Sequence, residues 1–258
     1  MPTADINGQK IHYEVKGNGI PVILIPGMGT GASFWDPLVP LLPDHKLITL
    51  DNRGAGTTKY AGKISISDMT DDIVALMDHL SIFKAHVVGW SMGGCMATEF
   101  SIRHPERVIS LTLISPYMRR PSRSSYAMFA AMKAVKEGAS LDVLSMIVQV
   151  MCFPESVFQK RDEKGTRNNI TPFGSTIQGI IDQMEAVDAY DGRKLPQQIS
   201  VPTLWIHGLS DIMVPPEMGE EIASQIRNCK RHLVPGAGHI VNPVTYHKAM
   251  LDHFRKNE

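Results

Sequence analysis

The 258-residue sequence has few cysteines, no excess of charge of either sign and no long apolar run. Its three cysteines, Cys95, Cys152 and Cys229, have no metal-binding spacing, so we expect buried or semi-buried free thiols in a reducing compartment and no bound metal. Twenty-six basic residues balance twenty-six acidic ones, which argues against nucleic acid or an anionic membrane as a partner. The apolar runs 21–26 and 146–151 are too short to cross a bilayer, and no signal peptide is expected. These features predict a cytoplasmic protein.

Short β-branched runs alternate with helical periodicity over most of the chain. Strands are predicted at residues 22–25, 46–50, 85–88, 108–114, 203–207 and 231–234. Helices are predicted at residues 34–42, 67–80, 92–103, 217–226 and 244–254. The pair Asn7-Gly8 adds a hairpin near the N-terminus. This alternation is typical of one α/β domain with a mainly parallel sheet and helices on both faces.

The alternation is interrupted in the middle of the chain. Residues 117–190 show no strand pattern, and helices are predicted there at residues 126–137, 141–151, 155–164 and 176–190. We therefore predict a core formed by residues 1–116 and 191–258, with a helical lid inserted over residues 117–190. Several lid methionines, including Met128 and Met151, lie on apolar faces. They either pack the helices or form a pliable lining for an apolar pocket.

One pentapeptide, Gly89-Trp90-Ser91-Met92-Gly93, carries the most informative chemical signal. It follows a β-branched run and precedes helix-forming residues, as the G-x-S-x-G nucleophile elbow requires. In that motif the serine occupies a sparsely allowed backbone region, and flanking glycines let strand and helix approach. The following helix directs the positive end of its dipole at the site, where a developing oxyanion is stabilised. Ser91 is therefore the predicted nucleophile.

A serine hydroxyl needs a neighbouring base and an acid that orients the base. After such an elbow the acid is expected first and the histidine second, each on a loop after a late strand. Asp211 follows the predicted strand 203–207, and His239 lies in a glycine-rich loop after the strand 231–234. We therefore predict that Asp211 and His239 complete a catalytic triad with Ser91.

Other aspartates and histidines fit these roles less well. Asp51 also follows a strand, but it precedes the elbow, and we interpret it as an anchor for its own loop. Three histidines in predicted strands are interpreted as side chains packed on the sheet or as rim residues: His86, His207 and His232. Of these candidates only His239 lies in a loop at the carboxyl end of a strand, where open α/β sheets assemble their sites. The sequence has no HExxH, P-loop or GxGxxG motif.

Two backbone N–H groups are needed to stabilise the oxyanion of an acyl-transfer reaction. One is expected at Met92, directly after the nucleophile, and the other in the loop after strand 22–25. In that loop the sequence Pro26-Gly27-Met28-Gly29 predicts that the N–H of Met28 is the second donor. Losing one such donor costs about 3–4 kcal/mol of transition-state stabilisation.

Together these motifs resemble the α/β-hydrolase superfamily over essentially the whole chain, in the branch of 3-oxoadipate enol-lactonases, carboxylesterases and cofactor-free haloperoxidases. The resemblance rests on the 26–29 segment, the Asp51-Asn52-Arg53-Gly54-Ala55-Gly56 loop, the elbow, and the loops at Asp211 and His239. It implies an eight-stranded, mainly parallel sheet with an inserted lid, and no cofactor. It also implies hydrolysis of a small carboxylic ester or lactone through an acyl-enzyme. Pro26 stands where many members have a histidine that braces the oxyanion loop.

The resemblance also predicts an apolar site that binds the acyl part of the substrate. Its predicted substrate contacts are Gly27, Trp90, Met128 and Met151. The expected partner is a small-molecule ester or lactone, with no nucleic acid and no membrane. The protein is expected to be a monomer or a homodimer.

Two alternatives stay open. One is a hydrolase that cleaves the C–C bond of a meta-cleavage-type diketone. The other, from a different class, is a small-molecule receptor that carries the triad but turns its ligand over slowly. A cationic cluster at the start of the lid is either a solvated turn or a site for substrate carboxylates: Arg119, Arg120 and Arg123. Both the lactonase and the C–C hydrolase readings use such cations, so the cluster does not separate them.

Overall fold

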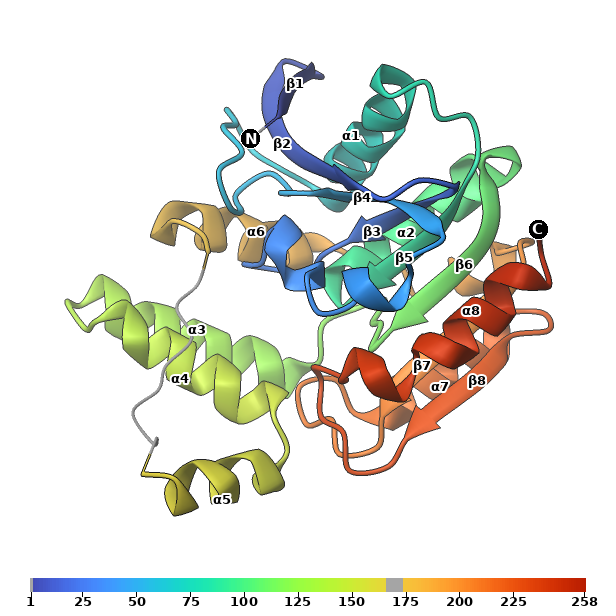
Figure 1. The fold of residues 1–258 in the computed structure, drawn as a ribbon. Helices are drawn as coiled ribbons and strands as arrows, with labels where there is room; N and C mark the ends of the chain where they lie inside the picture. Colours follow the sequence, from blue (N-terminus) through green and yellow to red (C-terminus); the bar gives the residue numbers. More distant parts are fainter. Residues whose placement is uncertain (1, 166–173) are drawn as a thin grey trace.

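The computed structural model describes residues 2–165 and 174–258 and contains one eight-stranded sheet (Figure 1). The strands are β1 (Thr3–Ile6), β2 (Gln9–Lys16), β3 (Ile20–Ile25), β4 (His45–Leu50), β5 (Ala85–Trp90), β6 (Val108–Ile114), β7 (Thr203–Gly208) and β8 (Lys230–Val234). Their order in the sheet is β1-β2-β4-β3-β5-β6-β7-β8. β2 runs antiparallel to both β1 and β4, and all other neighbouring strands are parallel. The predicted mainly parallel sheet of eight strands is confirmed.

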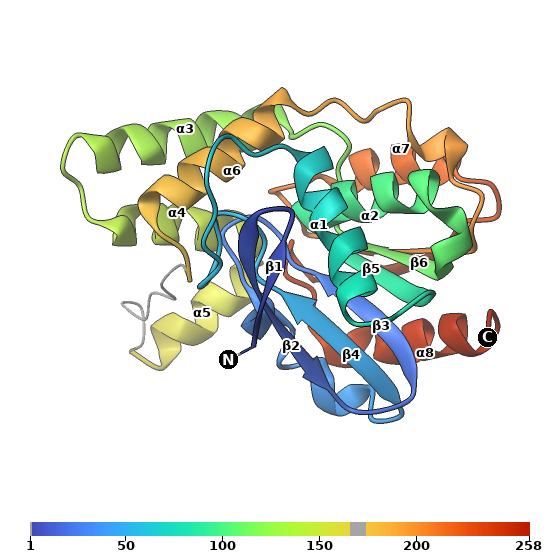
Figure 2. The same ribbon diagram turned by 90° about the horizontal axis from the view of Figure 1, so that it is seen from above.

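Helices cover both faces of this sheet (Figure 2). One face carries α1 (Ile66–His79), α2 (Met92–Arg103) and α7 (Pro216–Gln225). The other carries α8 (His247–Arg255) and the short 3-10 helices η1 (Ala32–Trp35) and η2 (Val39–Leu41). Because successive strand residues point to opposite faces, Ile23 packs with the first set and Leu24 with the second. Burial of each such side chain contributes about 1.5–3 kcal/mol, so the sheet is a firm frame for the loops at its edges.

Three predicted helices differ from the structure. The helix predicted at residues 126–137 begins earlier, at Ser122. The segment predicted as one helix over residues 34–42 forms two separate 3-10 turns, η1 and η2. Pro37 and Pro40 explain the difference, because they lack the N–H groups that a continuous helix would use there. The helix predicted from residue 244 begins only at His247, after a 3-10 turn at Pro243–Thr245.

Four helices lie between β6 and β7. They are α3 (Ser122–Lys136), α4 (Leu141–Cys152), α5 (Glu155–Glu163) and α6 (Ile177–Ala189). α3, α4 and α5 extend away from the sheet in Figure 1, and α3, α4 and α6 share an apolar cluster that includes Met128, Leu144 and Ile180. The division of the chain into core and lid stays a prediction, and residues 166–173 of that lid lie outside the described residues. In the described part of the chain no single helix is long and apolar enough to cross a membrane; only α4 and α5 together, across a 120° bend, meet that criterion.

Candidate active site

Ser91 lies at the sharp turn between β5 and α2. Its backbone angles are φ 56° and ψ −119°, a conformation that costs a non-glycine residue about 1–3 kcal/mol. The flanking glycines allow the turn: a Cβ at Gly89 would lie 2.3 Å from the carbonyl oxygen of Gly93. A Cβ at Gly93 would lie 2.2 Å from the carbonyl oxygen of Ile25. The crowding expected from the elbow sequence is therefore present.

The structure brings Ser91, His239 and Asp211 together from three separate segments. Nε2 of His239 lies 2.8 Å from Oγ of Ser91, and its Nδ1 lies 2.8 Å from Oδ2 of Asp211. Asp211 follows β7 and His239 follows β8, so both loops leave the carboxyl ends of parallel strands. All three side chains are buried. In this arrangement the Ser91 hydroxyl donates to Nε2, and the Nδ1–H of His239 donates to Asp211.

The backbone of His239 is fixed by two side chains from neighbouring strands. The indole N–H of Trp90 and the hydroxyl of Ser115 each donate to the carbonyl oxygen of His239 over 3.1 Å. Ser115 directly follows β6 and, like Ser91, has a positive φ, here 46°. Trp90 was predicted as a substrate contact, and this hydrogen bond gives it a structural role as well.

Asp211 is an ionised carboxylate in a buried place. Burial raises the pKa of Asp211, but the charge of His239, hydrogen bonds from His207 and His239, and the N–H of Val214 together lower it to about 2. The Val214 N–H donates to Oδ1 over 2.9 Å, and Nε2 of His207 lies 3.2 Å from Oδ2. The interpretation of His207 as a side chain packed on the sheet was therefore incomplete, because the residue also contacts the candidate acid.

An apolar cavity of about 50 Å³ lies beside Ser91 and His239. Three predicted residues line it: Met28, Trp90 and Met128. Gly27 lies next to the serine, because a Cβ on it would be 3.2 Å from Cβ of Ser91. Met151 is buried on α4, but among the described residues it is not one of those that line this cavity.

Several lining residues were not predicted from the sequence. Cys152 and Val148 at the end of α4, and Tyr117 after β6, contribute to the cavity wall. Burial and the charge of Asp211 raise the pKa of the Cys152 thiol, so it stays protonated and is a weak nucleophile. All three cysteines are free and buried, as expected from their spacing. In the described residues no group of three or more His, Cys, Asp or Glu side chains is arranged to hold a metal.

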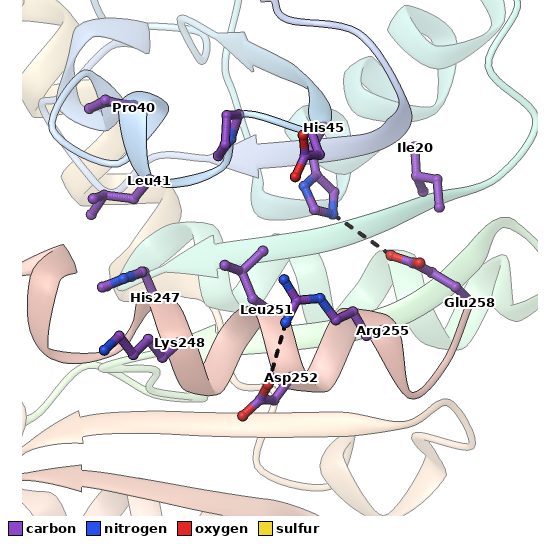
Figure 3. A pocket seen from close by; sticks show the side chains of 12 residues that line it. Ile20, Pro40, Leu41, His45, His247, Lys248, Leu251, Asp252, Arg255 and Glu258 are labelled. Carbon is purple, nitrogen blue, oxygen red and sulfur yellow. Dashed lines mark ion pairs between the residues drawn. The ribbon is translucent and has the colours of Figure 1, made fainter.

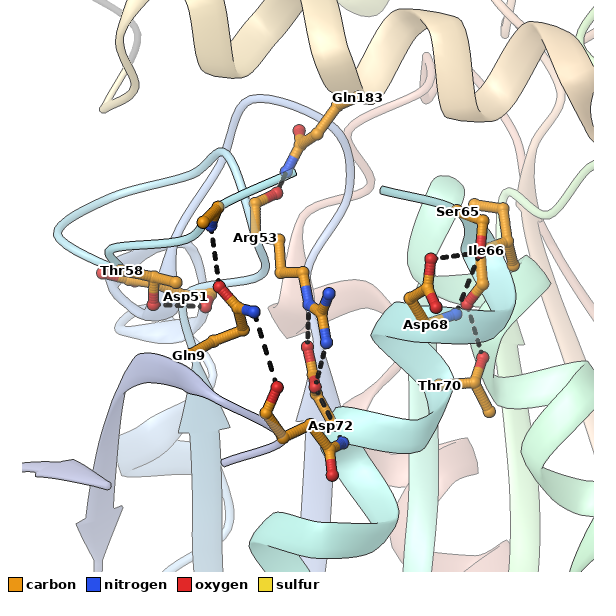
Figure 4. A network of polar contacts seen from close by, with 12 residues as sticks. Gln9, Asp51, Arg53, Thr58, Ser65, Ile66, Asp68, Thr70, Asp72 and Gln183 are labelled. Carbon is orange, nitrogen blue, oxygen red and sulfur yellow. Dashed lines mark hydrogen bonds and ion pairs between the residues drawn. The ribbon is translucent and has the colours of Figure 1, made fainter. Parts of the chain in front are cut away.

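The loop of residues 26–29, which is the candidate oxyanion loop, is braced by a glutamine from α6. The N–H of Gly29 donates to Oε1 of Gln183 over 2.7 Å, and Nε2 of Gln183 donates to the carbonyl oxygen of Arg53 over 2.7 Å. Figure 4 shows Gln183 reaching from α6 to Arg53, whose guanidinium pairs with Asp72 on α1. Gln183 is fully buried. Gln183 therefore braces the loop of residues 26–29, in which Pro26 stands where many members of the resembled family have a bracing histidine.

Replacing Gln183 by methionine is expected to lower kcat/KM roughly 10- to 100-fold, because the Gly29 N–H and the Arg53 carbonyl lose a buried partner and the loop loosens. The isosteric apolar side chain keeps the packing. Gln178→Met on the exposed side of the same helix is the matched control and should leave kcat/KM unchanged. Equal activity of the two variants would show that the loop is held by other contacts.

The competing residues have structural partners. Asp51 accepts hydrogen bonds from the N–H groups of Ala32 and Thr57 over 2.8 and 2.7 Å, and so anchors its own loop as interpreted. His86 is buried within β5 and contacts the hydroxyl of Ser110. These contacts leave Asp211 and His239 as the pair that meets Ser91.

A larger cavity of about 700 Å³ lies at the opposite edge of the sheet (Figure 3). It is lined by residues near the amino ends of β3 and β4, such as Ile20 and His45, and by one side of α8. Two ion pairs in it join His45 to Glu258 and Asp252 to Arg255, both over 3.8 Å. None of the three candidate catalytic residues lines this cavity. Open α/β sheets bind ligands at the carboxyl ends of their strands, so the smaller cavity is the candidate site.

Comparisons with known proteins agree with this geometry. Residues 20–244 match the family model described as alpha/beta hydrolase fold. The chain is 28% identical over 252 residues to the "Putative carbamate hydrolase RutD" of Azorhizobium caulinodans, covering 95% of this chain and 94% of that protein. It is 29% identical over 258 residues to the "Putative non-heme bromoperoxidase BpoC" of Mycobacterium tuberculosis, covering 94% and 96%. A solved enol-lactonase from Burkholderia xenovorans LB400 is similar at a TM-score of 0.87 and 26% identity, covering 98% and 100%. The chain therefore belongs to the α/β hydrolase fold family, and its relatives support a hydrolase.

Proposed function

We propose that this protein hydrolyses a small carboxylic ester or lactone through an acyl-enzyme formed on Ser91. The observation that carries the proposal is the continuous chain from Ser91 through His239 to Asp211, with both contacts at 2.8 Å. A serine that donates to an imidazole, itself oriented by a carboxylate, is an activated nucleophile. The names of the similar enol-lactonase and carbamate hydrolase add support for a hydrolytic reaction.

The reaction has two halves, and in each half His239 first accepts one proton and then donates it. In the first half, Oγ of Ser91 bonds to the substrate carbonyl carbon while its proton passes to Nε2 of His239. The bond to the leaving oxygen then breaks, and that oxygen takes the proton from Nε2. In the second half, a water gives a proton to Nε2, attacks the acyl carbon and releases the acid, and Ser91 recovers its proton. Asp211 keeps its negative charge throughout and stabilises the imidazolium.

The negative charge on the substrate oxygen is stabilised by the N–H groups of Met28 and Met92. Met92 is the first residue of α2, where the unpaired N–H groups of a helix carry partial positive charge. Met28 lines the same cavity as Ser91, in the loop that Gln183 braces. Each donor of this kind contributes roughly 3–4 kcal/mol to transition-state stabilisation.

The cavity sizes favour a short acyl group. The cavity beside Ser91 measures about 50 Å³, which is room for about two groups of the size of a water molecule. A second cavity of about 320 Å³, between α4 and the Gly29–Phe34 segment, shares Val148 and Cys152 with the first. A substrate with a small acyl part and a larger leaving group fits this division, with the leaving group beside Ile240, the neighbour of His239.

Hydrolysis of p-nitrophenyl esters of increasing acyl length tests this proposal. We expect the shortest esters to react fastest, because each methylene that the pocket cannot hold costs roughly 1–3 kcal/mol. Met128→Ala should move the optimum to longer chains, since Met128 lines the cavity. Met132→Ala on the same helix is the matched control: it is buried in the same cluster but does not line the cavity. An optimum at long acyl chains in the unmodified protein would contradict a small acyl site.

Arg120 suits a substrate that carries a carboxylate, which is either a lactone or, as the second candidate, a diketone that is hydrolysed at a C–C bond. Arg120 is buried and is one of the residues that line the cavity. Its Nε donates to Ser125 over 3.0 Å and its Nη2 to Asp188 over 2.5 Å, whereas Nη1 contacts the Met28 sulfur at 3.7 Å. A thioether is a weak acceptor, so donors of Arg120 are available to a substrate carboxylate. Faster turnover of a meta-cleavage-type diketone than of any ester would favour this candidate.

A further inference from the structure

Two buried aromatic side chains of β7 lead from the core of the sheet to the candidate acid. Trp205 and His207 lie two residues apart and so share one face of the strand. The indole N–H of Trp205 donates to Nδ1 of His207 over 3.1 Å. Nε2 of His207 lies 3.0 Å from the carbonyl oxygen of Val214 and 3.2 Å from Oδ2 of Asp211.

These contacts determine which nitrogen of His207 carries its proton. An indole N–H can only donate, so Nδ1 accepts and holds no proton. The proton of the neutral ring is therefore on Nε2, between the Val214 carbonyl oxygen and the Asp211 carboxylate, which both accept. Oδ2 of Asp211 also receives the Nδ1–H of His239, and Oδ1 receives the N–H of Val214. Both carboxylate oxygens are thus occupied by donors.

We propose that His207 is a positioning residue whose Nε2–H, fixed by Trp205, is a second donor to Asp211 and keeps that carboxylate charged and turned toward His239. This inference rests on the proposed function, because His207 acts through the triad and does not touch the substrate. A buried carboxylate is costly to keep charged unless several donors satisfy it. The donors from His207 and Val214 hold Asp211 from two sides and leave Oδ2 aligned with His239.

Packing leaves these rings little room for another arrangement. Both side chains are almost completely buried, at 0% exposure for His207 and 1% for Trp205. α7 contacts them through Gly219, where a Cβ would lie 2.6 Å from Nδ1 of His207 and 2.6 Å from Cζ2 of Trp205. The titratable groups facing Asp211 are His207 from β7, His239 from the loop after β8 and the protonated Cys152 thiol from α4.

The test compares two substitutions at position 207. His207→Gln has a carbonyl oxygen that accepts from Trp205 and an amide N–H that donates to Asp211, whereas His207→Leu keeps the volume and has neither group. The probe is diethyl p-nitrophenyl phosphate. Its phosphorus bonds to Oγ of Ser91, the Ser91 proton passes to His239, and p-nitrophenolate leaves. The rate of its release reports the triad whatever the natural substrate is.

We expect His207→Leu to lower the second-order rate constant roughly 10- to 100-fold, the usual effect of losing a donor to a charged group. We also expect the acid limb of the rate profile to move to higher pH. The positive end of the Nε2–H dipole of His207 points at Oδ2 of Asp211 and so disfavours a positive charge on the neighbouring imidazole of His239. Loss of this N–H favours that charge, and the acid limb moves to higher pH. His207→Gln should keep the rate and the position of the limb close to those of the unmodified protein.

Trp205→Phe is the second variant, for the case in which His207→Leu fails to fold. It leaves His207 in place but removes the N–H that fixes its tautomer, so the same shift of the acid limb is expected. Unchanged rate and profile in the folded His207→Leu variant, or in Trp205→Phe, would overturn the inference. A loss in His207→Gln as large as that in His207→Leu would do the same, because it would show a packing effect. No reaction of the unmodified protein with the phosphate would instead overturn the proposed function.

Discussion

Replacing Ser91 by alanine is expected to lower kcat/KM for a short p-nitrophenyl ester by roughly 10⁶-fold. Oγ of Ser91 is the atom that lies 2.8 Å from Nε2 of His239, and alanine leaves the imidazole without a nucleophile to activate. What activity remains should come from the N–H groups of the oxyanion site and from substrate binding alone. The fold should persist, because alanine is smaller than serine and adopts the same positive φ of 56° at similar cost.

Ser101→Ala is the matched control for this experiment. Ser101 is also a buried serine of α2, but its hydroxyl donates to the carbonyl oxygen of Thr98 within the helix. This variant should keep its activity and lose about 1 kcal/mol of stability. If the Ser91 variant retained more than about a hundredth of the activity, the acyl-enzyme on Ser91 would be excluded, given the loss expected for a nucleophile. If the unmodified protein bound esters tightly without hydrolysing them, the receptor alternative would gain support.

The three residues of the proposed triad could be predicted because each belongs to a short local pattern. Ser91 is marked by Gly89 and Gly93, whose missing side chains are needed within five residues of chain. Asp211 and His239 lie in the loops that follow two strands recognisable from the sequence. In a parallel sheet the carboxyl ends of neighbouring strands meet at one edge, so local patterns suffice to place these residues near one another.

The residues that support this trio were missed because their partners are distant in sequence or depend on side-chain packing. Gln183 is 154 residues from Gly29 along the chain, and no local pattern indicates that α6 packs on the oxyanion loop. That contact is possible because Gly54 and Gly179 let the backbones approach: a Cβ at Gly179 would lie 2.1 Å from the carbonyl oxygen of Gly54. His207 was assigned to the sheet from its place in a strand. The spacing of Trp205, His207 and Asp211 was the only sequence signal for its second contact.

The helices between β6 and β7 contact the loops of the candidate site directly. α6 supplies Gln183 to the oxyanion loop, and α4 ends at Cys152, whose carbonyl oxygen accepts the N–H of Ile240 over 3.3 Å. A Cβ at Gly238 would lie 2.4 Å from the same oxygen, so the chain around His239 is packed directly on the end of α4. Movement of these helices would therefore alter the oxyanion loop and the histidine loop together.

Replacing Asp211 by asparagine is expected to lower kcat/KM by roughly 10⁴-fold without unfolding the protein, because the substitution disturbs the tautomer of His239. Both oxygens of Asp211 accept hydrogen bonds: Oδ1 from the Val214 N–H, and Oδ2 from His239 and His207. Asparagine has only one acceptor oxygen. If that oxygen faces Val214, the amide N–H groups face His239, whose proton must then move to Nε2. An imidazole protonated at Nε2 cannot accept the proton of Ser91. Activity within tenfold of the unmodified protein would exclude Asp211 as the acid of the triad.

The same variant gives a stability test whose sign follows from the pKa of Asp211. The folded value of about 2 lies below the value of about 3.9 for an unfolded chain, so the charged carboxylate stabilises the fold. This contribution, about 2–3 kcal/mol, is fully present above the unfolded pKa and is lost as the pH falls through the folded one. Urea unfolding at about pH 6 and about pH 3 measures it. The stability difference between the unmodified protein and Asp211→Asn should shrink at the lower pH, because only the unmodified protein has, at position 211, a carboxylate that binds a proton more readily when unfolded. A difference that does not change with pH would mean that the Asp211 charge adds nothing to the fold, contrary to a carboxylate held by three donors.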